Sequence, residues 1–319
     1  MAPRETERTR KVGIVGAGMV GSSFAYALMQ RSMATDIVLV DTNRARAEGE
    51  AMDLMHGVPF VRPLRITAGG YEDLAGADLV VMTAGANQTP GETRTQLLGR
   101  NVAVCREVIP QIVKHNPDGL LVMTTNPVDI LTYEAARIAG LPPGHVFGSG
   151  TILDTARFRA LLGDYFDVDP RSVHAYIIGE HGDTELPVWS QANIGGVQLL
   201  DYPLANGGRA DEAALETIVE QTRTAAYAII ERKKATYYAI GLGLLAIAEA
   251  VLRDQRTVLT VSTPLTGQYG VSGVALSLPT VVGTEGASLV LPLELSTKEQ
   301  EQFHHSAATL IKLMHEAGV

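Results

Sequence analysis

The sequence predicts an α/β protein in which a doubly wound parallel sheet is followed by an α+β domain. In the first half, short apolar runs alternate with segments of helical periodicity, which is the pattern of repeated βα units. These runs do not alternate with polar residues, which is typical of parallel strands buried on both faces. After about residue 150 the strand-like segments cluster together instead. We expect an N-terminal extension over 1–10, the parallel-sheet domain over 11–149 and the α+β domain over 150–319.

The elements of the first half follow one another as expected of βα units. KVGIVG (11–16) is a short strand that ends in a glycine-rich turn, and MVGSSFAYALMQR (19–31) has helical spacing. DIVLVD (36–41) repeats the strand, and the helix after it stops at Gly57. This second helix is expected at 43–57, and further strands are expected at 64–69, 78–85 and 119–125.

The second half begins and ends with a helix. Between these helices, three β-rich segments follow in succession, TVLTVST, GVALSLPTVVG and GASLVLPLEL, and they indicate antiparallel strands. The expectation of an α+β domain rests on them. Helices are expected at 151–166, 211–233, 235–254 and near 296–316, and a separate strand at 173–179.

Composition limits the class of protein. The chain has 319 residues and a net charge of −9, which argues against binding to nucleic acid or to anionic membranes. The single cysteine, Cys105, lies in an apolar helical pattern, where a core residue is expected, and it favours a reducing, cytoplasmic location. Residues 1–11 lack the apolar core of a signal peptide, and the most apolar stretch, 237–252, is too short to span a bilayer.

Residues 16–21 form a G-x-G-x-x-G motif that directly follows a strand and opens a helix. Gly16 allows the tight turn, Gly18 lets a pyrophosphate approach the backbone, and Gly21 lets the helix pack closely on the strand. Asp41 ends the second strand, where a carboxylate binds a ribose 2′-hydroxyl and disfavours a 2′-phosphate. The motif predicts a Rossmann domain that binds NAD. The alternative is a structural turn followed by a helix-capping aspartate.

Reduction of a carbonyl group needs a proton donor, which is most often histidine. Of the eight histidines, His181 follows a strand-like run and lies in GEHGDTE. A histidine in this role needs a carboxylate on its other ring nitrogen, which Asp154 is able to supply. Arg157 shares a helix face with Asp154 and is able to bind a substrate carboxylate. The alternative is an ordinary surface ion pair between Asp154 and Arg157, and spacing alone leaves both open.

Six segments occur in an order that resembles the L-lactate dehydrogenase branch of the lactate/malate dehydrogenase family. The resemblance covers the chain apart from its N-terminal extension. It implies NAD as the cofactor, pyruvate and L-lactate as the substrates, and a place in fermentative glycolysis. The segments are GAGMVGSSFAYAL, AGANQTPGETR, TTNPVD, GSGTILDTARFR, GEHGDTELPVWS and KKATYY.

The resemblance also implies a role for each matching residue. His181 is the proton donor and acceptor, Asp154 is its partner, and Arg94 polarises the reacting carbonyl. The loop around 86–99 closes over the substrate. The implied substrate-binding residues are Gln88, Arg94, Asn126, Arg157 and Thr236. The implied cofactor-binding residues are Gly16, Gly18, Met19, Val20, Gly21, Asp41, Thr83, Ala84, Gly85, Asn101, Thr124 and Asn126.

Gln88 distinguishes lactate from malate as the substrate. The resemblance implies that residue 88 contacts the group on C3 of the substrate, where malate dehydrogenases of the family carry an arginine that pairs with a second carboxylate. The neutral amide of Gln88 tolerates a methyl group but leaves a second carboxylate without a partner, which costs several kcal/mol. Thr236 fits the lactate pattern too. Thr89 departs from the lysine or other long polar residue of many members, which bears on loop closure rather than on substrate class.

Arg159 and His174 indicate a second anion site. Arg159 is two residues beyond Arg157 and therefore about 200° round the helix, away from the catalytic face. From the residues alone, a solvated arginine and a half-buried strand histidine are the alternative. Bacterial lactate dehydrogenases activated by fructose 1,6-bisphosphate carry Arg and His at these places, where they meet across a subunit interface. The resemblance therefore implies a homotetramer with an allosteric fructose 1,6-bisphosphate site.

Three alternatives remain open. The first is another 2-hydroxy-acid dehydrogenase, acting on malate or a branched 2-oxo acid. The second is an NAD-dependent glycosidase, which is disfavoured because its metal ligands are missing and no metal site is expected. The third is an NAD-sensing module without enzymatic activity, which would not need Arg94, Asp154, Arg157 and His181 together. A short-chain dehydrogenase is disfavoured because no tyrosine is followed four positions later by lysine.

Overall fold

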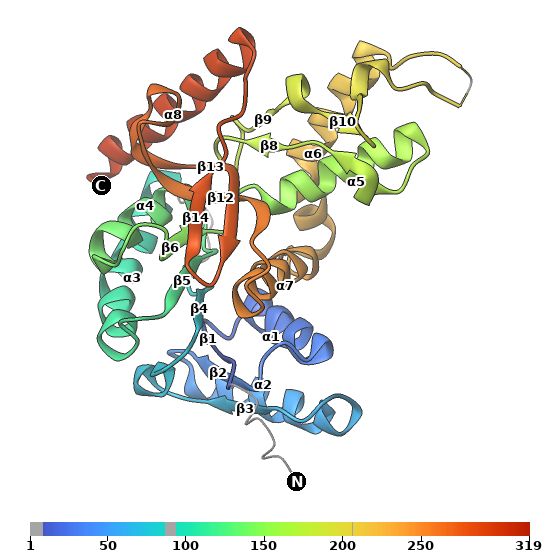
Figure 1. The fold of residues 1–319 in the computed structure, drawn as a ribbon. Helices are drawn as coiled ribbons and strands as arrows, with labels where there is room; N and C mark the ends of the chain where they lie inside the picture. Colours follow the sequence, from blue (N-terminus) through green and yellow to red (C-terminus); the bar gives the residue numbers. More distant parts are fainter. Residues whose placement is uncertain (1–8, 87–93, 206) are drawn as a thin grey trace, which may run out of the picture.

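The computed structural model describes residues 9–86, 94–205 and 207–319. In its first half, six parallel strands lie in the order β3-β2-β1-β4-β5-β6, with helices between them in the chain (Figure 1). This arrangement is the doubly wound parallel sheet that the sequence predicts. The elements are β1 (Lys11–Val15), α1 (Met19–Arg31), β2 (Asp36–Val40), α2 (Arg44–Gly57), β3 (Arg65–Ala68), β4 (Leu79–Met82), α3 (Arg94–His115), β5 (Leu120–Met123), α4 (Val128–Ala139) and β6 (Val146–Gly148).

The strand order reverses beside β1, which pairs with β2 on one side and with β4 on the other. Backbone hydrogen bonds tie the ends of these three strands together: the Gly16 N–H donates to the Val40 carbonyl at 2.7 Å, and the Thr83 N–H donates to the Val15 carbonyl at 2.8 Å. Ligands of doubly wound sheets bind in the crevice at such a reversal, outside the carboxyl ends of the strands. The glycine-rich turn therefore lies where the fold places its ligand.

Two elements of the first half, α4 and β6, are not predicted by the apolar pattern. Helix α4 buries polar residues as well as apolar ones, since Asp129, Thr132 and Glu134 are all buried. Strand β6 has three residues, which is too short for a periodicity to be recognised.

In the second half, the antiparallel strands extend the parallel sheet. Strand β12 pairs with β6 through Ser262 and Gly148, and β13 and β14 follow, so that one nine-stranded sheet spans both halves. The sheet crosses the expected domain boundary, which stays a prediction. The expected strand at 173–179 is instead split into β7 and β8, and only the first five residues of 286–295 form a strand. The elements are α5 (Ile152–Phe166), β7 (Val173–His174), β8 (Ile177–Ile178), β9 (Leu186–Pro187), β10 (Asn193–Ile194), β11 (Val197–Gln198), α6 (Glu212–Lys233), α7 (Tyr238–Leu252), β12 (Thr257–Thr266), β13 (Ser272–Gly283), β14 (Gly286–Val290) and α8 (Thr297–Ala317).

Helices cover both faces of the large sheet. Apolar side chains of α3, α4 and α8 pack with the sheet in one cluster, and those of α1, α2 and α7 pack with it in another (Figure 1). Cys105 is fully buried in the first cluster, where burial raises the pKa of its thiol to about 12, so the expectation of a core residue is confirmed. Across the described residues, each helix is either too short or too polar to span a bilayer.

Helix α6 is capped by Lys234, whose φ of 70° lies in the left-handed region. Glycine is the usual residue at such a helix end because it has no Cβ to strain this conformation. We expect Lys234→Gly to raise the free energy of unfolding by about 0.5–1 kcal/mol. Urea denaturation of the two proteins measures the difference. Arg253→Gly is the control, because Arg253 caps α7 with φ of −110° and has no such strain to relieve. An equal gain in both variants would contradict the argument.

Candidate active site

The glycine-rich turn after β1 has the shape of a phosphate-binding turn. Gly16 has φ of 108°, and a Cβ on Gly21 would lie 2.0 Å from the Gly16 carbonyl oxygen, so both positions require glycine. Gly18 has open space where its Cβ would be, and it caps α1 without a side chain to satisfy the first N–H groups of the helix. These belong to Met19, Val20 and Gly21. An anionic pyrophosphate fits this space, because the helix end supplies hydrogen-bond donors and a positive dipole.

Asp41 lies just after β2 and faces the same turn. Its Oδ2 accepts the Ala17 N–H at 2.7 Å, and its Oδ1 accepts the Asn43 N–H at 2.8 Å. Each oxygen retains a second lone pair, so this half-exposed carboxylate is also able to accept ribose hydroxyls. The alternative of a helix-capping aspartate is wrong, because Asn43 caps α2 by accepting the Arg46 N–H.

Asn101 on α3 joins the chain after β4 to the chain after β5. Its Oδ1 accepts the Ala86 N–H at 2.7 Å, and its Nδ2 donates to the Asn126 carbonyl at 2.9 Å. The side chain is buried, with 2% exposed. Both ends of its amide are therefore used to hold the backbone of residues beside the crevice.

The carboxyl ends of β4 and β5 carry the other predicted cofactor residues. Thr83 donates its hydroxyl to the Gly16 carbonyl at 2.8 Å, and Ala84 and Gly85 continue from it along the crevice. The Thr124 hydroxyl is buried and has no hydrogen-bond partner among the described residues. An orphaned buried hydroxyl is unusual, and it fits a polar group of a bound dinucleotide.

Two predicted catalytic residues, Asp154 and His181, meet the predicted substrate-binding Arg157 at one carboxylate. Oδ2 of Asp154 lies 2.5 Å from Nδ1 of His181, and Oδ1 accepts an N–H of Arg157 at 2.8 Å. Asp154 is in the first turn of α5, and Arg157 is three residues further on, so both side chains leave the same face. Asp154 is 2% exposed, which excludes an ordinary surface ion pair with Arg157. The His181 side chain is 24% exposed and is open to a ligand.

The electrostatics of this cluster favour a protonated histidine. Burial lowers the pKa of His181, but the charge and hydrogen bond of Asp154 outweigh burial and raise this pKa to about 9. Burial also acts to raise the pKa of Asp154, yet His181 and Arg157 hold it below its usual value. Because a carboxylate only accepts, Nδ1 of His181 carries a proton toward Asp154, and Nε2 is the nitrogen available to a substrate.

Two further buried carboxylates lie near His181 and are absent from the residues predicted by sequence. Oδ2 of Asp129 accepts the backbone N–H of His181 at 2.7 Å. Glu185 is 4% exposed, and its Oε1 has no partner among the described residues. Burial first, and then the charge of Asp154, raise the pKa of Glu185 to about 8. Asp129 lies in TTNPVD and Glu185 in GEHGDTELPVWS, so acidic residues inside family motifs were the available signal.

Of the other predicted substrate-binding residues, some lie in the described part of the chain and some outside it. Asn126 follows β5, and Thr236 lies half-buried in the turn between α6 and α7. Arg94 is the first residue of α3, but its side chain lies outside the described part of the chain. Gln88 and Thr89 fall in the undescribed segment 87–93, which holds half of the closing loop expected around 86–99. Residues 94–99 of that expected loop belong instead to helix α3.

Arg159 faces away from Arg157, as the helical spacing predicts. Its Nε donates to the Ala175 carbonyl at 2.9 Å, and its guanidinium carbon lies 5.2 Å from the centre of the Tyr176 ring. Arg159 is half-buried and bonded to the backbone, so it is not the fully solvated arginine of the alternative, and burial lowers its pKa. His174 is exposed on β7, next to Ala175, rather than half-buried. The structure thus brings Arg159 to the strand that carries His174.

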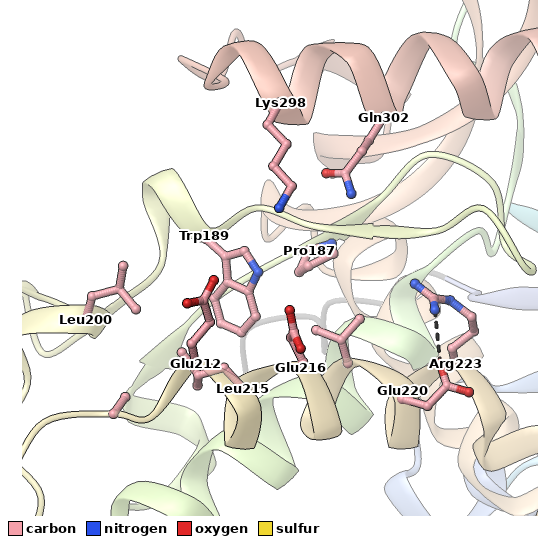
Figure 2. Close-up of a pocket in the computed structure, with 12 residues that line it drawn as sticks. Pro187, Trp189, Leu200, Glu212, Leu215, Glu216, Glu220, Arg223, Lys298 and Gln302 are labelled. Carbon is pink, nitrogen blue, oxygen red and sulfur yellow. Dashed lines mark hydrogen bonds and ion pairs between the residues drawn. The ribbon is translucent and has the colours of Figure 1, made fainter.

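Residues outside the Asp154 cluster and the glycine-rich turn form a groove of about 740 Å³. Figure 2 shows Trp189 and Pro187 between Glu216 on α6 and the side chains of Lys298 and Gln302 on α8. Its lining includes neither the residues of the Asp154 cluster nor those of the glycine-rich turn. The groove is therefore separate from the candidate active site.

Two family models together match nearly the whole chain. The model described as "lactate/malate dehydrogenase, NAD binding domain" matches residues 10–148. The model described as "lactate/malate dehydrogenase, alpha/beta C-terminal domain" matches residues 151–318. The matches account for both the parallel-sheet half and the half that carries His181.

Individual relatives are similar over almost their full length. The chain is 50% identical to the L-lactate dehydrogenase of Priestia megaterium over 310 residues, which is 97% of each chain. It is 52% identical to that of Geobacillus thermodenitrificans over 301 residues, 94% of this chain and 95% of the relative. A crystal structure of the minor L-lactate dehydrogenase from Enterococcus mundtii, in a ligands-bound form, superposes with a TM-score of 0.93 at 40% identity and covers 97% of this chain and 98% of that chain.

The raised pKa of His181 predicts how stability depends on pH. The folded protein holds this proton up to a pKa of about 9, whereas the reference pKa is 6.5. The stabilisation is therefore fully present below pH 6.5 and is lost as the pH rises to about 9. We expect the free energy of unfolding of wild type, minus that of His181→Asn, to fall by about 2–3 kcal/mol over this range. Urea denaturation at several pH values measures it, and a constant difference would contradict the assignment.

Proposed function

The chain belongs to the lactate/malate dehydrogenase family, and from this premise we propose that it is an L-lactate dehydrogenase that uses NAD to interconvert pyruvate and L-lactate. The relatives named above carry that name at about half sequence identity over nearly the whole chain. The observation that supports the proposal most directly is the Asp154 carboxylate, which holds both His181 and Arg157. A proton donor and a carboxylate-binding group thereby stand side by side, as reduction of a 2-oxo acid requires.

We assign each side chain a part in the reaction. Arg157 binds the carboxylate of pyruvate and turns the 2-oxo group toward His181, and Arg94 polarises that oxygen. Protonated His181 donates a hydrogen bond from Nε2 and transfers this proton to the oxygen as negative charge develops there. Asp154 keeps the ring in place and stabilises its protonated form. When bound, NADH supplies the hydride that reduces C2 of pyruvate.

The cofactor residues divide into those that contact NAD and those that hold the contacts in place. Gly18 and the start of α1 receive the pyrophosphate, Asp41 receives the ribose, and the Thr124 hydroxyl meets a polar group of the nicotinamide half. Asn126 contacts both the nicotinamide ribose and the substrate. Asn101 acts indirectly through the backbone that it braces.

We also infer a cytoplasmic homotetramer that serves fermentative glycolysis. Large apolar side chains exposed together on a soluble protein mark an interaction surface. Tyr26 on α1 is 51% exposed, and Tyr238 and Leu242 on α7 are 69% and 61% exposed. These three side chains line one groove of about 510 Å³, which suits a second copy of the chain. Arg159 and His174 are assigned to a fructose 1,6-bisphosphate site formed where two subunits meet.

Substrate choice tests the proposed function. Oxidation of NADH, followed by absorbance, should be faster with pyruvate than with oxaloacetate or 2-oxoisocaproate at equal concentration. If wild type had a higher kcat/KM for oxaloacetate than for pyruvate, the lactate assignment would fall.

Gln88→Arg tests what sets that choice. An arginine at 88 pairs with the second carboxylate of oxaloacetate, so we expect the ratio of kcat/KM for oxaloacetate over pyruvate to rise roughly 100-fold. Asn87→Arg places the same charge on the neighbouring residue and serves as the matched control. A similar change in both variants would mean that overall charge, rather than position 88, decides substrate preference.

Fructose 1,6-bisphosphate should lower the KM for pyruvate in the wild-type protein, because it favours the quaternary state with higher substrate affinity. Initial rates at low pyruvate, with and without the bisphosphate, measure the effect. Arg159→Gln should abolish it, whereas Arg171→Gln should not, since Arg171 is highly exposed and pairs with Asp169. An unchanged KM in wild type at both neutral and acid pH would remove the effector assignment.

A further inference from the structure

A second carboxylate, besides that of Asp154, is hydrogen-bonded to His181. Asp129 lies in the first turn of α4, and its Oδ2 accepts the backbone N–H of His181 at 2.7 Å. Its Oδ1 accepts the hydroxyl of Ser262 on β12 at 2.6 Å. Asp129 is 2% exposed. One side chain thus connects the helix that follows Asn126, the antiparallel strand next to β6 and the loop that carries the histidine.

The two donors that hold Asp129 are both uncharged. A buried charge with only neutral partners is costly, and a neutral amide or hydroxyl would satisfy the same two groups more cheaply. Asp154 differs, because it has Arg157 and the imidazole itself as cationic partners. A neutral side chain at position 129 would lack only the negative charge that Asp129 places near the His181 ring.

We propose that Asp129 is a positioning residue that fixes the backbone of His181 and, through its charge, favours the protonated imidazole that binds pyruvate. The expected effect of Asp129 on turnover rests on the proposed function. The structural part of the proposal concerns only the protonation of His181 and is measurable without any substrate.

The charges around His181 give the direction of the effect. Asp154 and Arg157 face it from α5, Asp129 faces it from α4, and Glu185 faces it from its own loop. Glu180 interacts with Asp129, and Arg223 on α6 interacts with Glu185. After Asp154, the charge of Asp129 is the next to raise the pKa of His181 toward about 9. Burial raises the pKa of Asp129 itself to about 6, so Asp129 is ionised over the range in which His181 loses its proton.

Asp129→Asn removes the charge and keeps the hydrogen bonds. The amide oxygen accepts the His181 N–H, and the amide nitrogen donates to the Ser262 hydroxyl, which is able to turn and accept. Diethyl pyrocarbonate reacts with the neutral imidazole only, so its rate at His181, followed by mass spectrometry of the peptide, reports the protonation of that ring against pH. We expect the pH of half-maximal rate to fall by about one unit in Asp129→Asn. The fall of kcat/KM for pyruvate at alkaline pH should move by the same amount.

Glu134→Gln is the matched control. Glu134 is another buried carboxylate on α4, but it pairs with Arg106 and Arg137 rather than with the histidine loop. This variant should leave the half-maximal pH at His181 unchanged. Asp129→Glu, which keeps the charge, should lie nearer to wild type than Asp129→Asn does.

Each outcome decides the proposal. An unshifted His181 profile in folded Asp129→Asn, or an equal shift in Glu134→Gln, overturns it. If Asp129→Asn does not fold, Asp129→Thr provides a second neutral side chain, shorter than asparagine and with a single hydroxyl, for which the same shift is expected. If neither neutral variant folds while Asp129→Glu does, Asp129 serves folding alone and the proposal fails. Wild type that does not reduce pyruvate would refute the proposed function instead, since the diethyl pyrocarbonate profile is independent of turnover.

Discussion

The candidate active site depends on the buried carboxylate of Asp154. Its two oxygens hold a histidine and an arginine at once, at 2.5 Å and 2.8 Å, so one side chain fixes the distance between the proposed proton donor and the proposed anion-binding group. Burial makes this arrangement demanding, because a buried carboxylate without its cationic partners would be an uncompensated charge that costs several kcal/mol. The same burial strengthens the attraction, which explains why the pKa of His181 rises although burial by itself would lower it.

The sheet determines the position of the second carboxylate, that of Asp129. Strand β12 joins β6 at Ser262, and Ser262 in turn donates to Asp129, so the continuous sheet brings the helix that begins within TTNPVD against the loop of His181. The reversal of strand order beside β1 puts the glycine-rich turn at the carboxyl edge of the same sheet. The proposed cofactor site and the proposed proton donor thus stand on one continuous sheet and its helices. A site held on strands and helix ends loses little entropy when a substrate binds.

Much of this was predictable from local patterns. Helix α1 matches its predicted span of 19–31, the six-residue glycine motif lies where a Rossmann turn must lie, and the i, i+3 spacing correctly placed Asp154 and Arg157 on one face. The missed parts have physical reasons. Helix α4 buries three polar residues, so its apolar face is interrupted, and the stretch 173–179 divides because its two halves pair with different strands, β10 and β9.

The sequence by itself determined the fold class, the nucleotide-binding turn and the family, because these depend on periodicity and on motifs that are local in the chain. The prediction that Gln88 favours lactate over malate also comes from the sequence, through the missing charge at a position that the resemblance places against C3 of the substrate, and it stays a prediction. The family resemblance implied that Asp154 meets His181 across 27 positions, and the structure confirms that contact. Only the tertiary structure showed that Asp129 reaches the same residue across 52 positions. Spacing cannot reveal such pairs, because hydrogen bonds between distant segments follow from how the sheet and helices pack. The same holds for the pKa of a buried group, which is set by neighbours that the chain order does not disclose.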